Sequence, residues 1–174
     1  MSLPLRIGML GMGNAGLAFV PAIAKHPEFE LAAFVEPHEN ARFAAQAKYG
    51  VPGHATLAQL LTEGPRLDAV CIASPTEYHT AQALQAMDAG LHVLVEKPMA
   101  LRLQDADDMI RACDEAGYFW YEDPYRDSGV SAVGHQRLRS RQQAHHHGHG
   151  LATHDDVGRK GFLEQAFLST EFNR

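Results

Sequence analysis

Residues 5–16 read LRIGMLGMGNAG, and this stretch decides the fold. Its first half is apolar apart from one arginine, which predicts a β-strand over 5–10. Its second half has the spacing G-x-G-x-x-G, formed by Gly11, Met12, Gly13, Asn14, Ala15 and Gly16. At a strand-to-helix turn the first glycine allows a tight turn, the second lets the backbone approach a pyrophosphate, and the third allows close helix packing. The helix predicted over 14–25 then offers the free N–H groups of its N-terminus to phosphates.

An acidic residue follows the glycine turn at a distance of about 20 positions. It is Glu36, and it directly follows the apolar segment LAAFV at 31–35, which predicts a second strand. A carboxylate at this place accepts hydrogen bonds from a ribose 2′-OH and repels a 2′-phosphate, so the pattern favours NAD over NADP. Arg42 lies about one helical turn further on and leaves NADP open, because its guanidinium can reach a 2′-phosphate. In the alternative interpretation, the glycines are ordinary turn residues and Glu36 is a solvated loop charge.

Strand-length apolar segments alternate with helical patterns as far as residue 121. Further strands are predicted over 68–73, 92–95 and 118–121, and further helices over 38–49, from 56, over 76–89 and over 103–116. Strands separated by helices form βαβ units, which predicts an α/β fold with a doubly wound parallel sheet of the Rossmann type. A closed eight-stranded barrel needs about 250 residues, whereas this chain has 174.

Local signals refine three of the predicted helices. Thr56 and Gln59 have the spacing of a capping box at the start of a helix. The helix over 103–116 is predicted to bury an apolar stripe of Leu103, Ala106, Ile110 and Cys113. In the helix over 14–25 the corresponding stripe is Leu17, Val20, Ile23 and Ala24.

Two further loops are predicted at the edge where ligands bind to doubly wound sheets, beyond the carboxyl ends of the strands. In the loop over 73–79, Ser74 and Thr76 carry hydroxyl groups that can donate to ribose or phosphate, although Thr76 equally suits a helix N-cap. His79 falls in the first turn of a helix, where an isolated histidine is more often structural than catalytic. Lys97 follows the strand HVLVE and would lie over the crevice as a general acid or base, or else be a surface lysine.

Three stretches together are similar to one known family. They are the glycine turn at 11–16, ASPTEYH at 73–79 and AGLHVLVEKP at 89–98. The combination resembles the Gfo/Idh/MocA family of oxidoreductases over residues 5 to about 120, with EKP after the strand as its most specific element.

The resemblance implies an NAD(P)-dependent dehydrogenase that transfers hydride between nicotinamide and a sugar, polyol, dihydrodiol or similar hydroxyl compound. It implies that Lys97 hydrogen-bonds the reacting oxygen and assists proton transfer, and that the Lys97–Pro98 peptide bond is cis. The other matched positions are implied to contact the cofactor or to shape its loops: Ser74, Pro75, Thr76, His79, Glu96 and Pro98.

The family continues into a second, α+β domain that carries the substrate pocket and a catalytic histidine. We expect instead a dinucleotide-binding domain over 1–121 and an irregular tail over 122–174, poorly ordered or weakly helical and rich in Arg, Gln and His. A truncated gene, or a shifted reading frame after about residue 120, would explain the change of composition. VGHQR at 133–137 matches a family motif at an unexpected place, and we interpret it as chance.

The chain alone is therefore expected to turn over substrate weakly or not at all. The alternative is a nucleotide-binding remnant or regulatory module without catalysis. An interaction module that binds no nucleotide is disfavoured by the glycine turn and Glu36. With a second domain missing, one face of the first would be uncovered, which predicts self-association or modest stability.

Composition excludes several other classes. The net charge is −6, and the acidic excess lies in residues 1–121, which contain no basic stripe for nucleic acid. No apolar run reaches the roughly 18 residues of a membrane span, and the N-terminus lacks the basic region of a secretory signal. Cys71 and Cys113 are predicted to be reduced core thiols of a cytoplasmic protein. The run of histidines over 145–154 matches no standard zinc spacing, so no physiological metal is predicted.

Overall fold

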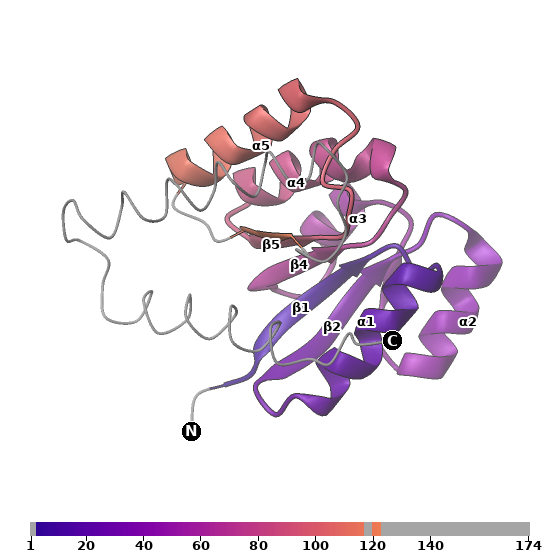
Figure 1. Cartoon of the computed structure of the whole chain (residues 1–174). Coiled ribbons are helices and arrows are strands. Elements are labelled where there is room, and N and C mark those ends of the chain that lie inside the picture. Colours follow the sequence, from indigo (N-terminus) through magenta and orange to yellow (C-terminus); the bar gives the residue numbers. More distant parts are fainter. Residues whose placement is uncertain (1–2, 117–119, 123–174) are drawn as a thin grey trace.

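The computed structural model describes residues 3–116 and 120–122, and these form one parallel sheet with helices on both faces (Figure 1). The sheet has six strands in the order β3-β2-β1-β4-β5-β6. The strands are β1 (Leu5–Leu10), β2 (Phe29–Val35), β3 (Gly53–His54), β4 (Ala69–Ile72), β5 (His92–Val95) and β6 (Trp120–Glu122). The helices are α1 (Asn14–Lys25), α2 (Glu39–Tyr49), α3 (Leu57–Glu63), α4 (His79–Asp88) and α5 (Leu103–Ala116), with a 3₁₀ turn η1 (Thr76–Tyr78).

The strand order reverses between β1 and β4, which confirms the predicted doubly wound fold. From β1 the chain moves outward to β2 and β3, then returns to place β4 on the other side of β1. Ligands of such sheets bind beside this reversal, beyond the carboxyl ends of the strands. The loops that leave β1, β2, β4 and β5 are therefore the candidate ligand-binding loops.

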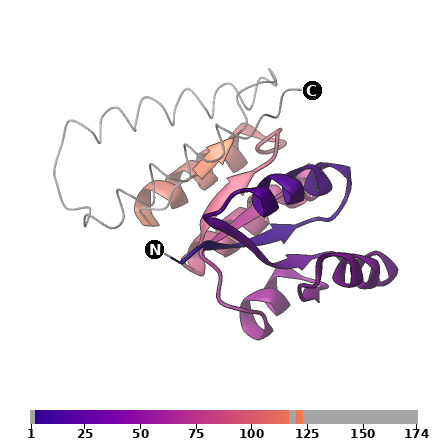
Figure 2. The same cartoon turned by 90° about the horizontal axis from the view of Figure 1, so that it is seen from below.

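Side chains of the central strands alternate between two cores. Along β4, Val70 and Ile72 pack with α3, α4 and α5, whereas Ala69 and Cys71 pack with α1 and α2. Successive residues of a strand point to opposite faces, so a strand covered on both faces is apolar throughout. Figure 1 shows α4 and α5 along one face of the sheet and α1 and α2 along the other, and Figure 2 gives the same arrangement from below.

Several predicted boundaries were wrong by a few residues. Strand β2 begins at Phe29, not at residue 31, and β4 is shorter than 68–73 by one residue at each end. The helix predicted over 76–89 is divided into η1 and α4. The short strand β3 was missed, because two residues carry no periodic pattern. Strand β6 (Trp120–Glu122) extends one residue past the predicted end at 121, so Glu122 belongs to the sheet and not to the predicted tail. Residues 118 and 119 and the rest of the predicted tail lie outside the described residues.

The predicted apolar stripes included buried residues of each helix but also exposed residues toward its ends, and in α5 they omitted one buried residue. In α5, Ala106, Ile110 and Cys113 are buried, but Leu103 is 51% exposed and Met109, which the stripe omitted, is fully buried. In α1, Val20 and Ile23 are buried, whereas Leu17 and Ala24 are exposed. Periodicity alone therefore does not determine which residues of a helix are covered by other elements.

The capping predictions had mixed outcomes. The hydroxyl of Thr56 accepts a hydrogen bond from the Gln59 N–H at 3.2 Å, as predicted, while the Gln59 side chain accepts from the N–H of Ala55. The prediction that Thr76 caps a helix was wrong. Pro75 precedes η1, Tyr78 precedes α4, and neither caps with its side chain.

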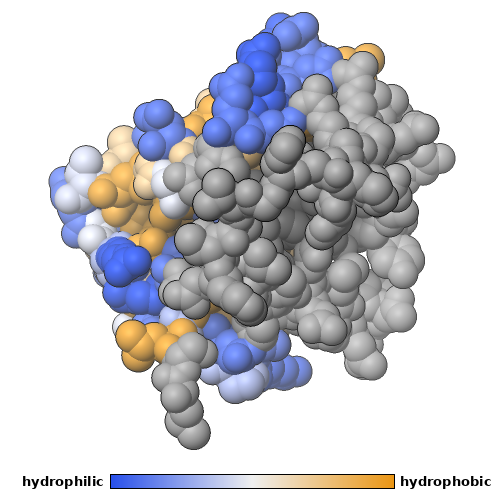
Figure 3. All heavy atoms as spheres, turned by 90° about the vertical axis from the view of Figure 1, so that its left-hand side faces the viewer, coloured by the Kyte–Doolittle hydropathy of each residue, from blue (hydrophilic) through white to orange (hydrophobic). Residues whose placement is uncertain are grey.

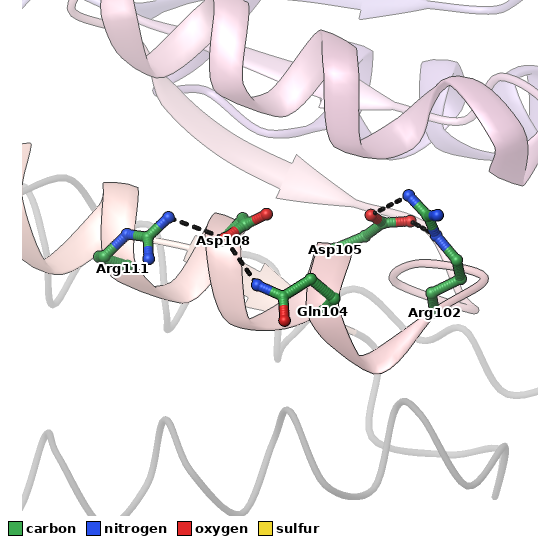
Figure 4. Close-up of polar contacts among 5 residues, drawn as sticks. All are labelled: Arg102, Gln104, Asp105, Asp108 and Arg111. Atoms are coloured by element: carbon green, nitrogen blue, oxygen red, sulfur yellow. Dashed lines mark hydrogen bonds and ion pairs between the residues drawn. The ribbon is translucent and has the colours of Figure 1, made fainter.

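The outer surface of α5 is charged, and its charges pair with one another. Arg102 makes two hydrogen bonds to Asp105, and Asp108 accepts from both Arg111 and Gln104 (Figure 4). On the face seen in Figure 3, hydrophobic and hydrophilic side chains of the described residues are interspersed. Within the described part of the chain, no helix is long and apolar enough to cross a membrane.

Candidate functional site

The ends of neighbouring strands are joined by hydrogen bonds that bring the predicted site residues to one edge of the sheet. Gly11 N–H donates to Val35, Glu36 N–H to His54, Ala73 N–H to Leu10 and Glu96 N–H to Ile72, all at 2.8–2.9 Å. Each donor is the first residue after its strand. The loops that begin at residues 11, 36, 73 and 96 therefore leave the sheet side by side.

The three glycines of the turn meet different surroundings. Gly11 has φ +92, and a Cβ there would lie 2.8 Å from the carbonyl oxygen of Ala73, so the turn needs glycine for both conformation and space. A Cβ on Gly16 would overlap the carbonyl oxygen of Gly11, because α1 packs directly on the turn. A Cβ on Gly13 would meet nothing within 4 Å. Only the second glycine faces open space, as expected where a ligand approaches the backbone.

Helix α1 begins at this open position. Gly13 is its N-cap residue without any side-chain cap, and the first turn contains no acidic residue. Backbone N–H groups in the first turn of a helix have no partner within the helix, and the helix dipole adds partial positive charge. Asn14, Ala15 and Gly16 thus present N–H groups suited to an anion beside Gly13.

Glu36 is buried, with 7% exposure, although it follows the strand as an ionisable residue. One carboxylate oxygen, Oε2, accepts from the N–H of Met12 at 3.3 Å, and Oε1 accepts from the N–H of His38 at 3.0 Å. The carboxylate therefore lies directly against the glycine turn. A carboxylate has about four acceptor positions, so two backbone donors leave room for a ribose hydroxyl.

Arg42 is held beside the same strand end. Its Nη1 donates to the carbonyl oxygens of Glu36 at 2.8 Å and Pro37 at 3.1 Å. The guanidinium is thereby tied to the backbone that follows β2.

The loop after β4 is tied to the first turns of α4. The hydroxyl of Ser74 donates to Oε1 of Gln82 at 2.6 Å. With its proton committed to Gln82, this hydroxyl offers lone pairs and can accept from a ribose hydroxyl. Pro75 is exposed and Thr76 is half-buried at the start of η1.

His79 lies beneath these loops rather than in open space. It is 1% exposed, and its Nε2 and Nδ1 lie 2.8 Å and 3.0 Å from the carbonyl oxygens of Ser74 and Pro98. Both ring nitrogens are occupied by backbone groups. The geometry favours the structural alternative for His79 over direct contact with a ligand.

The loop after β5 places Lys97 beside its own neighbour, Glu96. The N–H of Lys97 donates to Glu96 Oε2 at 2.7 Å, and Lys97 Nζ lies 3.5 Å from Glu96 Oε1. The lysine side chain is 35% exposed and that of the glutamate 18%, so the pair lies at the rim of the edge. The Lys97–Pro98 peptide bond is cis, as the resemblance implied.

Two contributions were missed by the sequence analysis. Gln82 fixes the Ser74 hydroxyl from eight residues away, and the backbone N–H of Met12 binds Glu36 across 24 residues. Neither has a short sequence motif, because each depends on how separate elements pack. Among the described residues no cluster of metal-ligating side chains is present, and the histidines over 145–154 lie outside them.

A protein-family model described as "Oxidoreductase family, NAD-binding Rossmann fold" matches residues 5–122. The chain belongs to the Gfo/Idh/MocA family. The model covers every loop of the edge described above, so the family match and the site geometry concern the same residues.

Individual Gfo/Idh/MocA proteins are similar over the same region. The chain is 38% identical over 106 residues to galactose 1-dehydrogenase of Pseudomonas fluorescens, a match covering 59% of this chain and 32% of that protein. It is 31% identical over 112 residues to 1,5-anhydro-D-fructose reductase of Ensifer adhaerens, covering 64% and 34% respectively. The chain thus spans about a third of the length of these curated relatives.

A solved structure extends the similarity to three dimensions. The WlbA dehydrogenase from Bordetella pertussis, in complex with NADH and UDP-GlcNAcA, superposes with a TM-score of 0.68 at 35% identity. The match covers 71% of this chain and 36% of that one. The described domain is the NAD-binding Rossmann domain of this oxidoreductase family.

Proposed function

We propose that this chain binds NAD at the carboxyl edge of its sheet and forms the dinucleotide-binding part of a dehydrogenase. The substrate class is a sugar, polyol, dihydrodiol or similar hydroxyl compound. Names such as galactose 1-dehydrogenase among the relatives support this class. When bound, the nicotinamide supplies the chemistry by accepting or donating a hydride.

The observation that carries the proposal is the space at Gly13. A cofactor cradle needs a backbone that a phosphate can approach, and a Cβ at Gly13 would meet nothing within 4 Å while the flanking glycines are closely packed. The N–H groups of the first turn of α1 lie at this position. The residues present therefore fit a pyrophosphate held by backbone donors and the helix dipole.

Glu36 supports NAD over NADP. Its carboxylate is fixed by Met12 and His38, so it cannot easily turn away from a 2′-phosphate placed beside it. A fixed anion repels a phosphate at close range and accepts from a ribose hydroxyl. Arg42 uses its Nη1 donors on the carbonyl oxygens of residues 36 and 37, so a 2′-phosphate would have to be bound by its Nε and Nη2 donors.

Lys97 is the proposed proton donor and acceptor at the substrate. Its ammonium group carries three donors and forms an ion pair with Glu96, whose Oε1 lies 3.5 Å from Nζ. The ammonium form can hydrogen-bond the reacting oxygen and donate a proton to it in the direction of reduction, and the neutral amine form can accept the hydroxyl proton in the direction of oxidation. Glu96 thereby orients the lysine and balances its charge.

A second candidate function is dinucleotide binding without catalysis. The length of the matches favours this function, because they span only about a third of the relatives' length. Under this proposal, the groups with which those proteins hold their substrates lie mostly outside the matched third. A regulatory or remnant module would bind NAD with the same edge and show no turnover.

We further propose a cytoplasmic location and self-association. Cys71 and Cys113 are buried and are not joined in a disulfide, which supports a reducing compartment. Leu101 and Leu103, which are 62% and 51% exposed, support association through the start of α5. Light scattering of the purified chain tests the second point.

Calorimetric titration of NAD(H) into matched glycine variants tests the main proposal. Gly13→Ala adds a methyl group in open space, so the melting temperature should remain close to that of the wild type while NAD(H) affinity falls at least tenfold. Gly50→Ala is the control, because this residue ends α2 with φ +70 far from the glycine turn in sequence. It should lose about 1 kcal/mol of stability and keep its NAD(H) affinity. Unchanged binding in Gly13→Ala would remove the proposed cradle.

A further inference from the structure

The loop that follows β2 has a hydrogen-bond partner for each backbone polar group from Glu36 to His38. The N–H of Glu36 donates to the carbonyl oxygen of His54, and the N–H of His38 donates to the Glu36 side chain. The carbonyl oxygen of His38 accepts from the N–H of Arg42. The carbonyl oxygens of Glu36 and Pro37 accept from the Arg42 side chain at 2.8 Å and 3.1 Å. One side chain thus completes the hydrogen bonding of the loop that carries the Glu36 carboxylate.

Arg42 passes close to β3 at a position that has no side chain. A Cβ on Gly53 would lie 2.8 Å from Cγ of Arg42 and closer still to the ring of the buried Phe34. The hydrocarbon stem of Arg42 therefore packs where a side chain of β3 would otherwise lie. Arginine often buries its stem in this way while its charged end reaches polar groups. The guanidinium is thus held by packing of its stem as well as by its hydrogen bonds.

The way in which Arg42 uses its donors differs from the usual grip on a phosphate. A guanidinium has five N–H donors, of which Nη1 carries two, and two carbonyl oxygens lie within hydrogen-bond distance of this nitrogen. Arginine typically holds a phosphate with two parallel N–H groups from different nitrogens. Here a single nitrogen holds the carbonyl oxygens of two consecutive residues instead. Arg42 therefore clamps the backbone of the loop.

We infer that Arg42 is a positioning residue that favours NAD over NADP by holding Glu36 in place. The clamp fixes the backbone from which the carboxylate projects, and with it the His38 N–H that Glu36 Oε1 accepts from at 3.0 Å. A carboxylate fixed in advance loses less freedom when it accepts from a ribose hydroxyl, and it cannot move away from a 2′-phosphate. Arg42, a cation that could attract a 2′-phosphate, then acts against NADP. This inference rests on the proposed binding of NAD at this edge of the sheet.

Calorimetric titration of NAD(H) and NADP(H) into Arg42→Met tests the direction of the effect. Methionine keeps an unbranched stem and lacks the N–H donors. The affinity for NAD(H) should fall roughly 2- to 10-fold, as for the loss of about one hydrogen bond, and the preference over NADP(H) should narrow. If Arg42 binds the 2′-phosphate directly, NADP(H) affinity falls more and the preference widens, which would overturn the inference. An unchanged preference would overturn it as well, because a merely structural residue changes stability alone.

Two matched variants serve as controls. Lys48→Met removes a positive charge from the last turn of the same helix, where the ammonium group lies 5.0 Å from the centre of the Tyr49 ring, and should leave both affinities unchanged. Arg42→Lys should keep most of the preference, because one ammonium nitrogen can donate to both carbonyl oxygens. A loss as large as that of Arg42→Met would overturn the clamp. If Arg42→Met does not fold, Arg42→Gln, whose amide ends short of the guanidinium position, carries the same expectation.

A double substitution tests whether Arg42 acts through Glu36. In the Glu36→Ala background the clamp has no carboxylate to position, so adding Arg42→Met should change the preference by less than about twofold. An effect as large as in the wild-type background would show that Arg42 acts independently of Glu36, and would overturn the inference.

Hydrogen exchange of the full chain without nucleotide gives a readout that does not depend on NAD. The N–H of His38 donates to Glu36, so it should exchange faster in Arg42→Met than in the wild type and in Lys48→Met. Equal exchange rates would overturn the clamp. Failure of the wild type to bind NAD(H) would instead remove the proposed function, so the two failures are distinguishable.

Discussion

The carboxylate of Glu36 accepts a hydrogen bond from the backbone N–H of Met12, joining the end of β2 to the glycine turn across 3.3 Å and 24 residues of sequence. The residue that would select the ribose therefore also holds the turn that would bind the phosphates. One substitution at this position should change both the orientation of the turn and the choice of nucleotide. This dual role distinguishes Glu36 from a freely solvated acidic residue.

Glu36→Ala should weaken NAD(H) binding and narrow its preference over NADP(H). The substitution removes the acceptor for the ribose 2′-OH, the repulsion of a 2′-phosphate and the contact to Met12. Hydrogen bonds to a charged group contribute about 1.5–3 kcal/mol, which corresponds to roughly 10- to 100-fold in affinity. Calorimetry with both nucleotides measures the change.

Glu36→Gln is the matched control for charge. It retains one acceptor oxygen for Met12 or His38 but loses the negative charge, so NADP(H) binding should improve more than NAD(H) binding falls. Wild-type protein that binds NADP(H) as tightly as NAD(H) would contradict the assigned role of Glu36.

Gly16→Ala should destabilise the fold itself. The added methyl group would overlap the carbonyl oxygen of Gly11, a backbone atom that can move only if α1 shifts away from the turn. Overpacking of this kind costs about 1–3 kcal/mol, and thermal denaturation measures the loss. Gly13→Ala provides the comparison within the same turn. Equal melting temperatures for the two variants would show that the close approach of α1 is not required.

The 174-residue chain alone should bind NAD(H) but turn over polyols, sugars and dihydrodiols slowly or not at all. Holding a substrate carbon against the nicotinamide can supply about 7–11 kcal/mol of the barrier, and the matched third of the relatives is their dinucleotide-binding part. NADH formation at saturating NAD is the assay. Rapid turnover that disappears in Lys97→Ala would show that this chain builds a working substrate site.

Arg102→Gln should raise the pKa of Asp105. The Arg102 guanidinium hydrogen-bonds that carboxyl group and holds its pKa below the usual value. Because the folded-state pKa is lowered, any stability from this pair is present above the usual aspartate range and is lost as the pH falls through the folded value. Both groups are at the surface, so the effect should weaken with salt. NMR titration of the carboxyl carbon measures it, and an unchanged Asp105 pKa in the variant would contradict the pairing.

Cys71 should resist alkylation in the folded protein. Burial, and then the negative charge of Glu96, raise the pKa of its thiol well above the usual value, which disfavours the reactive thiolate. Iodoacetamide should modify Cys71 only after unfolding, as mass spectrometry of native and denatured samples can show. Cys113 is also buried and should behave similarly. Rapid labelling of native Cys71 would indicate that β4 opens easily.

The sequence alone was enough to predict the doubly wound parallel sheet, although it missed the edge strand β3. The strand–turn–helix pattern over 5–25 agreed with β1 and α1 residue for residue, since buried parallel strands and glycine turns are local signals. EKP after β5 identified the family that the match over 5–122 shows. The spacing of Glu36 from the glycine turn placed an acid at the correct strand end because parallel strands finish at a common edge.

Contacts between loops were decided by the tertiary structure. In the sequence His79 is an isolated histidine, yet the packing of α4 brings the carbonyl oxygens of Ser74 and Pro98 to its two nitrogens. No sequence pattern predicted a role for Gln82, which α4 places against the Ser74 hydroxyl. Leu103 fitted a buried stripe but lies exposed, because periodicity describes one helix and not what covers it. Such relationships depend on the relative placement of separate elements, which short-range patterns in a sequence do not encode.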